Sequence, residues 1–406
     1  MPILYWCSLQ FIWNSLLPWL FAAYVAVTAI QLVIWLGVFC WQTGMLTGKM
    51  DVGAERVFHP DDQLNVYPDL PNTLDHAISV LICARNEALN LKRHLPSVLE
   101  QRYSGYFEVL VIDDASTDDT SNVLNQFQAI YPHLKVLRMA EKTSPGKKQA
   151  LARGIEAAKF DNLVFTDADC RPSSRFWLAN LVKALSERPE TEIVLGYGPF
   201  RPKSGFLNAW ARYETAYTAL QYVSFARSGI PYMGVGRNLA LKKQLYKRVG
   251  GFQAHRDLPS GDDDLLVNAG AQAGKVVVCL EKQAFMYSEA KTSWRAWLRQ
   301  KSRHLSAGTL YRRQHLVLLG LVGLTQVAHY SLLIMLLASG YGIGFVLLGY
   351  GIRLIALRLT LAKTLPAFGE SGLLTRFPVF DALLTLYYVG TIPLAFLGKR
   401  SKNDWK

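Results

Sequence analysis

Hydrophobic residues are unevenly distributed along the chain. Long uncharged runs lie near both ends, and residues 50–290 contain no comparable run. The run at residues 17–43 is long enough to cross about 30 Å of hydrocarbon as one helix. It is too long for the apolar part of a signal peptide, and no basic stretch precedes it. The pattern therefore predicts a membrane helix within residues 1–48, followed by a linker over residues 49–75.

A second apolar cluster, residues 314–398, predicts two or three further spans. Its runs cover residues 316–340, 341–362 and 378–398. The middle run contains Arg353 and Arg358, which are costly at the centre of a bilayer, and the last contains Asp381 and Pro393. If all three C-terminal runs cross the membrane, the basic tail over residues 399–406 would lie outside the cell, against the positive-inside rule. Either one run is re-entrant or interfacial, or the charge rule fails at this end.

Between the two apolar ends, short apolar runs alternate with segments of helical spacing. Strands are predicted over residues 77–85, 107–116, 134–140 and 162–169, with a helix after each of the first three. Strands separated by helices of this length imply right-handed βαβ units and a parallel sheet. We therefore expect an α/β domain over residues 76–290, with a mostly parallel, Rossmann-like sheet.

Polar residues follow three of these strands at the edge where ligands of such sheets bind. They are Arg85, Asn86 and Glu87, then Asp113 and Asp114, then Asp167 and Asp169. Two carboxylates one residue apart repel each other unless water or a cation compensates them, and carboxylate oxygens suit a divalent metal. A glycine-rich phosphate loop is absent from the sequence after the first strand, which disfavours the usual mode of dinucleotide binding.

Charge adds a membrane-facing surface to this picture. The net charge is +13, and basic residues gather at residues 293–314, beside a predicted span. Contact with anionic lipid on the cytoplasmic face explains this better than nucleic acid. Lys49 and Arg56 follow the first span, which places the α/β domain in the cytoplasm. The five cysteines have neither paired nor metal-ligand spacing and are expected to be small buried side chains.

Residues 291–313 predict an amphipathic helix at the membrane surface. Trp297, Gln300, Arg303 and His304 share one face of it, and an arginine fork suits a phosphate. The alternative is a lipid-anchoring helix whose polar face is only solvated.

Six segments in order carry a family resemblance: "LICARNEALNL", "VLVIDDASTDDT", "PGKKQALARGI", "VFTDADC", "SGDDDL" and "QKSRH". They resemble the membrane-bound, inverting family 2 glycosyltransferases of GT-A fold, a branch that includes cellulose, hyaluronan and poly-N-acetylglucosamine synthases and ceramide glucosyltransferase. The resemblance covers residues 76–310. It implies a nucleotide-sugar donor, most simply a UDP-sugar, a lipid-linked or glycan acceptor, Mg²⁺ or Mn²⁺, membrane lipids as partners and no nucleic acid. It also implies an integral membrane protein, such as one of a bacterial inner membrane.

The same resemblance implies roles for individual residues. The nucleotide pocket would contain Arg85, Glu87, Asp113, Asp114, Lys147, Lys148 and Asp167. Asp167 and Asp169 would hold the metal, and Gln300, Arg303 and His304 would meet the diphosphate or the acceptor. Asp263 would be the general base, with Asp262 as second choice because three consecutive aspartates leave the register open. His304 replaces a tryptophan that stacks on the acceptor sugar in the polysaccharide synthases, which weakens the case for a sugar-chain acceptor.

Plainer interpretations remain for several of these residues. Asp262 and Asp263 could be a solvated helix cap, Glu87 a capping residue, and Lys147 and Lys148 a solvated helix start. At the level of function, the alternatives to a transferase that adds one sugar are a processive polysaccharide synthase and a non-catalytic nucleotide-sugar-binding subunit. A transporter is disfavoured because the spans show no repeat.

Overall fold

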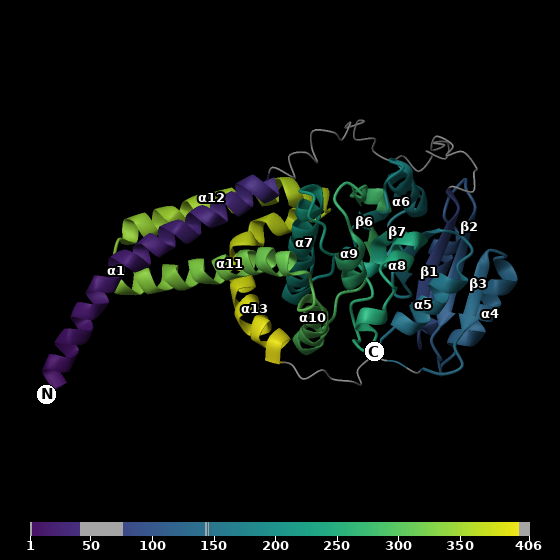
Figure 1. Cartoon of the computed structure of the whole chain (residues 1–406), viewed down its shortest axis with the longest axis horizontal. Coiled ribbons are helices and arrows are strands. Elements are labelled where there is room, and N and C mark those ends of the chain that lie inside the picture. The colour runs from purple at the N-terminus through teal and green to yellow at the C-terminus, as the bar shows by residue number, and fades with distance from the viewer. Residues whose placement is uncertain (1, 41–75, 143, 145, 398–406) are drawn as a thin grey trace.

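The computed structural model describes residues 2–40, 76–142, 144 and 146–397. Figure 1 shows an α/β domain from which a group of long helices extends away. The predicted linker over residues 49–75 and the basic tail over residues 399–406 lie outside the described residues.

A seven-stranded sheet forms the centre of the α/β domain. In spatial order its strands are β3 (Leu134–Arg138), β2 (Phe107–Asp113), β1 (Ile78–Ala84), β4 (Asn162–Asp167), β7 (Leu239–Lys242), β6 (Ile193–Gly196) and β8 (Val276–Cys279). The four strands predicted from the sequence form the parallel half, β3-β2-β1-β4. Strand β7 runs antiparallel to both β4 and β6, whereas β6 and β8 are parallel. The prediction of a mostly parallel sheet is therefore confirmed, and β7 is the reversal that it did not include.

Helices cover both faces of this sheet, which is why its strands are apolar throughout. One face carries α3 (Ala88–Leu99), α4 (Thr120–Ile130) and α6 (Trp177–Ser186); the other carries α5 (Lys148–Ala157), α7 (Phe206–Arg227) and α9 (Asp264–Gly270). Side chains of a strand alternate between the faces, so Val80 and Ile82 pack on the first face and Leu81 and Cys83 on the second. A short ladder, β5 (Arg171–Pro172) with β9 (Met286–Tyr287), lies beside the sheet's carboxyl edge.

Three of the long helices are suited to a membrane. They are α1 (Pro2–Leu32), which continues as a π-helix over Val33–Cys40, α11 (Arg313–Ser339) and α12 (Ile343–Ala367). By length and composition, Asn14–Cys40, Arg313–Ser339 and Ile343–Ala367 can each cross a membrane, with mean hydropathies of 2.1, 1.7 and 1.7. They pack against one another, and the N-terminal turns of α1 extend beyond the other two helices in Figure 1.

The fourth predicted span behaves differently. Helix α13 (Phe377–Leu397) runs across the ends of the other long helices in Figure 1 rather than alongside them. It packs against α11, α7 and the predicted surface helix, α10 (Trp294–Gly308). Helix α13 therefore lies between the α/β domain and the candidate spans.

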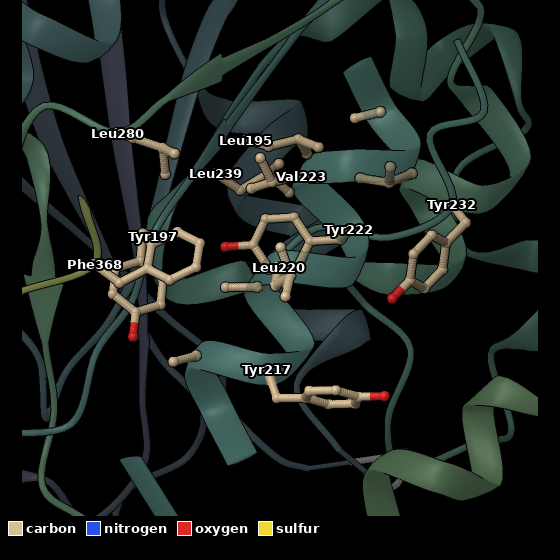
Figure 2. Packing of buried hydrophobic residues seen from close by; sticks show 14 of the residues in the cluster. Leu195, Tyr197, Tyr217, Leu220, Tyr222, Val223, Tyr232, Leu239, Leu280 and Phe368 are labelled. Carbon is tan, nitrogen blue, oxygen red and sulfur yellow. The ribbon is translucent and has the colours of Figure 1, made fainter. Parts of the chain in front are cut away.

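Helix α7 joins the sheet to the long helices. Figure 2 shows Tyr222 and Val223 of α7 packed beside Leu195 and Leu239 of the sheet, and the Tyr222 hydroxyl donates a hydrogen bond to the Gly196 carbonyl at 2.9 Å. On the opposite side of α7, the ring centroids of Tyr217 and Trp35 lie 5.9 Å apart, and those of Trp210 and Phe380 5.8 Å apart. One hydrophobic core therefore runs from the sheet through α7 into the long helices.

A buried ion pair holds these long helices together. The Arg353 guanidinium of α12 binds both carboxylate oxygens of Asp381 of α13, at 2.6 and 3.1 Å, and neither residue is exposed. Gln31 of α1 and Gln326 of α11 accept further hydrogen bonds from Arg353, at 3.2 and 2.6 Å, and Tyr330 donates one to Asp381 at 2.7 Å. An arginine that is costly in an apolar bundle is thus compensated by groups from three neighbouring helices, α1, α11 and α13.

We expect Arg353→Met to lower the free energy of unfolding by about 3–5 kcal/mol, because it leaves the Asp381 carboxylate buried without its cation. The double variant Arg353→Met/Asp381→Leu removes both charges, so its free energy of unfolding should fall clearly less than that of Arg353→Met. Thermal unfolding of the detergent-solubilised protein measures both, with Arg358→Met, an exposed arginine on the same helix, as control. A single variant no less stable than the double would contradict this account.

Candidate active site

Two loops at the carboxyl edge of the sheet are fastened to each other. They follow β1 (residues 85–87) and β2 (residues 114–119). Asn86 stands between them: its backbone N–H donates to the Ser116 hydroxyl at 3.0 Å, and its side-chain oxygen accepts from the Thr117 N–H at 2.8 Å. Asn86 and Ala115 adopt positive φ angles of 55° and 53°, a conformation that non-glycine residues keep only where the surroundings enforce it.

The two aspartates predicted after β2 differ in their partners. Asp113 supports the loop itself, since its carboxylate accepts hydrogen bonds from the Ser116 N–H at 3.0 Å and the Ser121 hydroxyl at 2.6 Å. Asp114 forms an ion pair with Lys142, whose ammonium also donates to the Gly146 carbonyl at 2.7 Å. Arg85 is half-buried at the end of β1. The predicted nucleotide residues of the first two strands therefore line one edge, with Asp113 already committed to the loop.

A lysine joins the acids after β4 to those before α9. The Lys147 ammonium lies 2.7 Å from Asp167 and 3.0 Å from Asp262. Burial opposes ionisation of Asp167, but Lys147, together with Arg237 and Arg303, holds its pKa below the ordinary value. The acids of "TDADC" and those of "GDDD", far apart in the sequence, thus meet at one place.

Asp169 and Cys170 extend this acidic group. One carboxylate oxygen from each of Asp167 and Asp169 and the Cys170 sulfur lie within 4.8 Å of one another, an arrangement that could hold a metal ion. Glu87, from the loop after β1, is close enough that the Asp169 and Asp167 carboxylates add to burial in raising its pKa. Four acidic side chains from three loops therefore share this corner: Glu87, Asp167, Asp169 and Asp262.

Asp263 begins helix α9 and is held by two backbone amides. Its carboxylate accepts hydrogen bonds from the Asp264 N–H at 2.8 Å and the Gly236 N–H at 2.6 Å. Burial, and next the Asp262 carboxylate, raise its pKa to about 6. A group with this pKa is suited to accept a proton near neutral pH. Asp263 is therefore both a helix cap and a candidate base.

A hollow lies where these residues meet. Its walls are formed by Leu81, Cys83, Lys147, Leu151, Phe165, Thr166, Gly236, Leu239, Asp262, Asp263 and Leu266. Lys147, Asp262 and Asp263 supply its charged groups, and apolar side chains of the core form most of the rest.

The second predicted lysine, Lys148, has a separate task. It is 2% exposed, and its ammonium donates to the carbonyl oxygens of His255 and Leu258 at 2.7 and 3.1 Å. Lys148 therefore holds the segment that leads into the three aspartates, while Lys147 faces the acids.

Helix α10 covers this region from the side of the long helices. Its Arg303 carbonyl accepts a hydrogen bond from the Ser260 hydroxyl at 2.9 Å, and His304 is exposed beside it. Gln300 is half-buried, and its side-chain oxygen has no partner among the described residues. Trp297 is only 2% exposed and packs between Trp210 and Tyr387, which leaves no face of it for an acceptor.

Sequence reasoning did not find the residues that brace α9. Tyr311, just after α10, donates a hydrogen bond to Asp264 at 2.8 Å. Burial, and next Asp263, raise the pKa of Asp264 to about 8. The spacing of Tyr311 relative to the aspartates carries no signal in the sequence, because the two lie 47 positions apart.

Comparison with known proteins agrees with this geometry. A sequence model described as "Glycosyltransferase like family 2" matches residues 76–307, more than half of the 406-residue chain. The chain belongs to the family 2 glycosyltransferases. The predicted family and enzyme class are therefore confirmed.

Individual members of this family show the extent of the likeness. The chain is 32% identical over 200 residues to the glycosyltransferase AglE of Haloferax volcanii, covering 48% of this chain and 62% of AglE. It is 28% identical over 147 residues to a beta-monoglucosyldiacylglycerol synthase of Nostoc sp., covering 36% of this chain and 30% of that protein. The matches thus span less than two thirds of these family 2 relatives.

A solved structure supports the fold. The mannosyltransferase PcManGT of Pyrobaculum calidifontis, in complex with GDP-Man and Mn²⁺, matches 91% of this chain and 99% of its own, with a TM-score of 0.53 and 20% sequence identity. Together with the sheet described above, this likeness confirms the predicted GT-A fold of the family 2 domain.

Proposed function

We propose that the protein is a membrane glycosyltransferase that transfers one sugar, with inversion, from a nucleotide-diphosphate sugar to a lipid-linked acceptor. One observation carries the proposal: Lys147 contacts both Asp167 and Asp262, so the candidate metal acids and the candidate base share one site. The donor is most simply a UDP-sugar, as the family resemblance implies. The relative from Nostoc is named as the synthase of a glycolipid, which supports a lipid acceptor over a growing glycan.

The roles of the side chains follow from charge and position. Asp263, with Asp262 as second choice, would remove the proton from the acceptor hydroxyl as it attacks. The departing diphosphate gains negative charge in the transition state, and Lys147 and Arg303 would meet it. Asp114 would release its ion pair with Lys142 and contact the nucleotide instead. Arg85 and Glu87 would line the same pocket. Gln300 and His304 would line the acceptor side of the diphosphate.

The acids also fit a divalent metal ion. Carboxylate oxygens are the ligands that Mg²⁺ and Mn²⁺ prefer, and Asp167 and Asp169 offer them within 4.8 Å of each other. These two residues would hold the ion, which would supply positive charge to the leaving diphosphate. The Mn²⁺ named in the PcManGT complex supports this assignment.

The helix arrangement favours a topology with three spans. Helices α1, α11 and α12 would cross the membrane, and α13 would lie in its cytoplasmic surface. The segment after α13 is then on the same side as the α/β domain. This topology satisfies the positive-inside rule for the basic residues 399–406, which four crossings would violate.

The decisive experiment incubates the purified protein in lipid with a panel of UDP- and GDP-sugars and a membrane extract. We expect mass spectrometry to detect a lipid that has gained one sugar from one of these donors. A polymer would identify a processive synthase instead. Donor binding without any transfer would favour a non-catalytic nucleotide-sugar-binding subunit.

Asp263→Asn should reduce transfer at least about 10²-fold and leave UDP binding nearly unchanged, because the amide keeps the shape but cannot accept the proton. The wild-type rate should fall as the pH drops below about 6, where Asp263 becomes protonated. Rate and calorimetric binding measurements check both statements. Asp262→Asn is the matched variant: if it alone abolishes transfer while Asp263→Asn does not, Asp262 is the base.

Asp169→Ala should remove the effect of Mn²⁺ on nucleotide binding, because it takes away one of two carboxylates at the candidate metal site. Calorimetric titration of UDP with and without Mn²⁺ compares the variant with wild type. Asp161→Ala, an exposed aspartate at the other end of β4, is the control. If Mn²⁺ enhances UDP binding equally in wild type and in Asp169→Ala, Asp169 is not part of the metal site.

A further inference from the structure

Helix α9, which begins directly after the candidate base, is fastened to the place where the chain enters its first C-terminal candidate span. That place, the entry junction, consists of residues 309–315, between the end of α10 and the first turn of α11. None of its residues is among those that line the hollow. Its contacts with α9 therefore need an explanation other than substrate binding.

The first contact joins Tyr311 to the residue after the candidate base. The Tyr311 hydroxyl donates to Asp264 at 2.8 Å, and the other oxygen of Asp264 accepts from the Leu265 N–H at 2.8 Å. The Tyr311 ring packs on Leu265 in a small apolar cluster with Leu258 and Ala307. A polar and an apolar contact thus fix the start of α9 to the junction.

A second set of contacts fixes the end of α9. The Asn268 side-chain oxygen accepts from the Arg312 N–H at 2.9 Å, and its amide nitrogen lies 2.8 Å from the His315 Nδ1 and from the Tyr232 carbonyl. The Arg312 guanidinium donates to the Ala269 carbonyl. Both ends of this short helix are therefore held by three residues of the junction: Tyr311, Arg312 and His315.

Helix α9 in turn holds the candidate base. The Asp264 N–H donates to the Asp263 carboxylate at 2.8 Å, so a shift of Asp264 moves one of the two amides that orient this carboxylate. The second amide belongs to Gly236 on a separate segment, and its site leaves little room, since a Cβ there would lie 2.9 Å from the Asp263 carboxylate. The carboxylate keeps both hydrogen bonds only while α9 stays in place.

We propose that Tyr311 is a positioning residue, which fixes α9 to the entry junction and thereby orients the carboxylate of Asp263 for proton transfer. The inference rests on the proposed function for the role of Asp263. Its consequence is that the base is oriented by the part of the chain that enters the candidate span α11. Small displacements of a catalytic group cost large factors in rate without a matching loss of substrate binding.

The test compares Tyr311→Phe with Tyr232→Phe. Tyr232 is the matched control because its ring centroid lies 5.9 Å from that of Tyr311, and its hydrogen bond to α9 is made by the backbone carbonyl, which the substitution leaves intact. For Tyr311→Phe we expect kcat to fall about 10- to 100-fold, with the KM for the donor and the affinity for UDP changed by less than about twofold. Tyr232→Phe should resemble wild type in each respect.

Hydrogen–deuterium exchange gives a readout that does not need transfer. In Tyr311→Phe the amides of Asp264–Gly270 should exchange faster than in wild type, and those of β1 and β4 should not. In an Asp264→Ala background, Tyr311→Phe should cause no further loss of kcat, since the hydrogen bond is already absent.

The outcomes separate the two proposals. Unchanged kcat together with unchanged exchange of α9 in Tyr311→Phe would overturn the positioning role. A parallel loss of UDP binding and of thermal stability would also overturn it, because Tyr311 would then only support the fold. If wild-type protein transfers no sugar from any donor, the proposed function fails, and the exchange of α9 still decides whether Tyr311 holds this helix.

Discussion

The acidic corner of the sheet depends above all on the ammonium group of Lys147. Asp167, Asp262 and Asp263 converge there, and like charges at such distances would disfavour ionisation without a nearby cation. The Lys147 ammonium lies 2.7 Å from Asp167 and 3.0 Å from Asp262. Burial opposes its charge, but Asp167, Asp262 and Asp263 outweigh this and hold the pKa of Lys147 above its ordinary value. The acids stay close together because Lys147 remains charged between them.

The local sequence around Lys147 explains how this cation is delivered. Gly146 adopts a φ of 75°, and a Cβ there would lie 2.5 Å from the Pro259 carbonyl oxygen, so the turn before α5 passes directly against the segment that leads to the aspartates. Lys148, the next residue but one, then binds carbonyls of that same segment. Two adjacent lysines thus divide the work: Lys148 secures the segment, and Lys147 neutralises the acids that it carries.

The sequence predicted the parallel half of the sheet because its strands and helices alternate locally. The reversal at β7 was missed, since β6, β7 and β8 are four residues each and their order depends on contacts distant in sequence. The family resemblance named the acids, yet it could not choose between Asp262 and Asp263 or between Lys147 and Lys148. The structure distinguishes the two lysines by their partners: Lys147 contacts Asp167 and Asp262, and Lys148 contacts backbone carbonyls. No local sequence pattern predicts the hydrogen bond between Tyr311 and Asp264, because the two residues are 47 positions apart and only the tertiary fold brings them together.

Two charge clusters among the described residues, one around Arg353 and one around Lys147, differ in how fully their polar atoms are paired, and this difference separates structure from chemistry. Arg353 and Asp381 are enclosed by Gln31, Gln326 and Tyr330, so each charged atom already has a partner. Such a closed network fixes helices and leaves no group for a ligand. At the sheet edge, by contrast, Lys147 binds one oxygen of Asp167, the Asp167 side chain is only partly buried, and Asp169 reaches solvent. An incomplete set of acids beside a hollow is the arrangement that a cation or a phosphate-bearing ligand would complete, which is why function is assigned to this corner and architecture to Arg353.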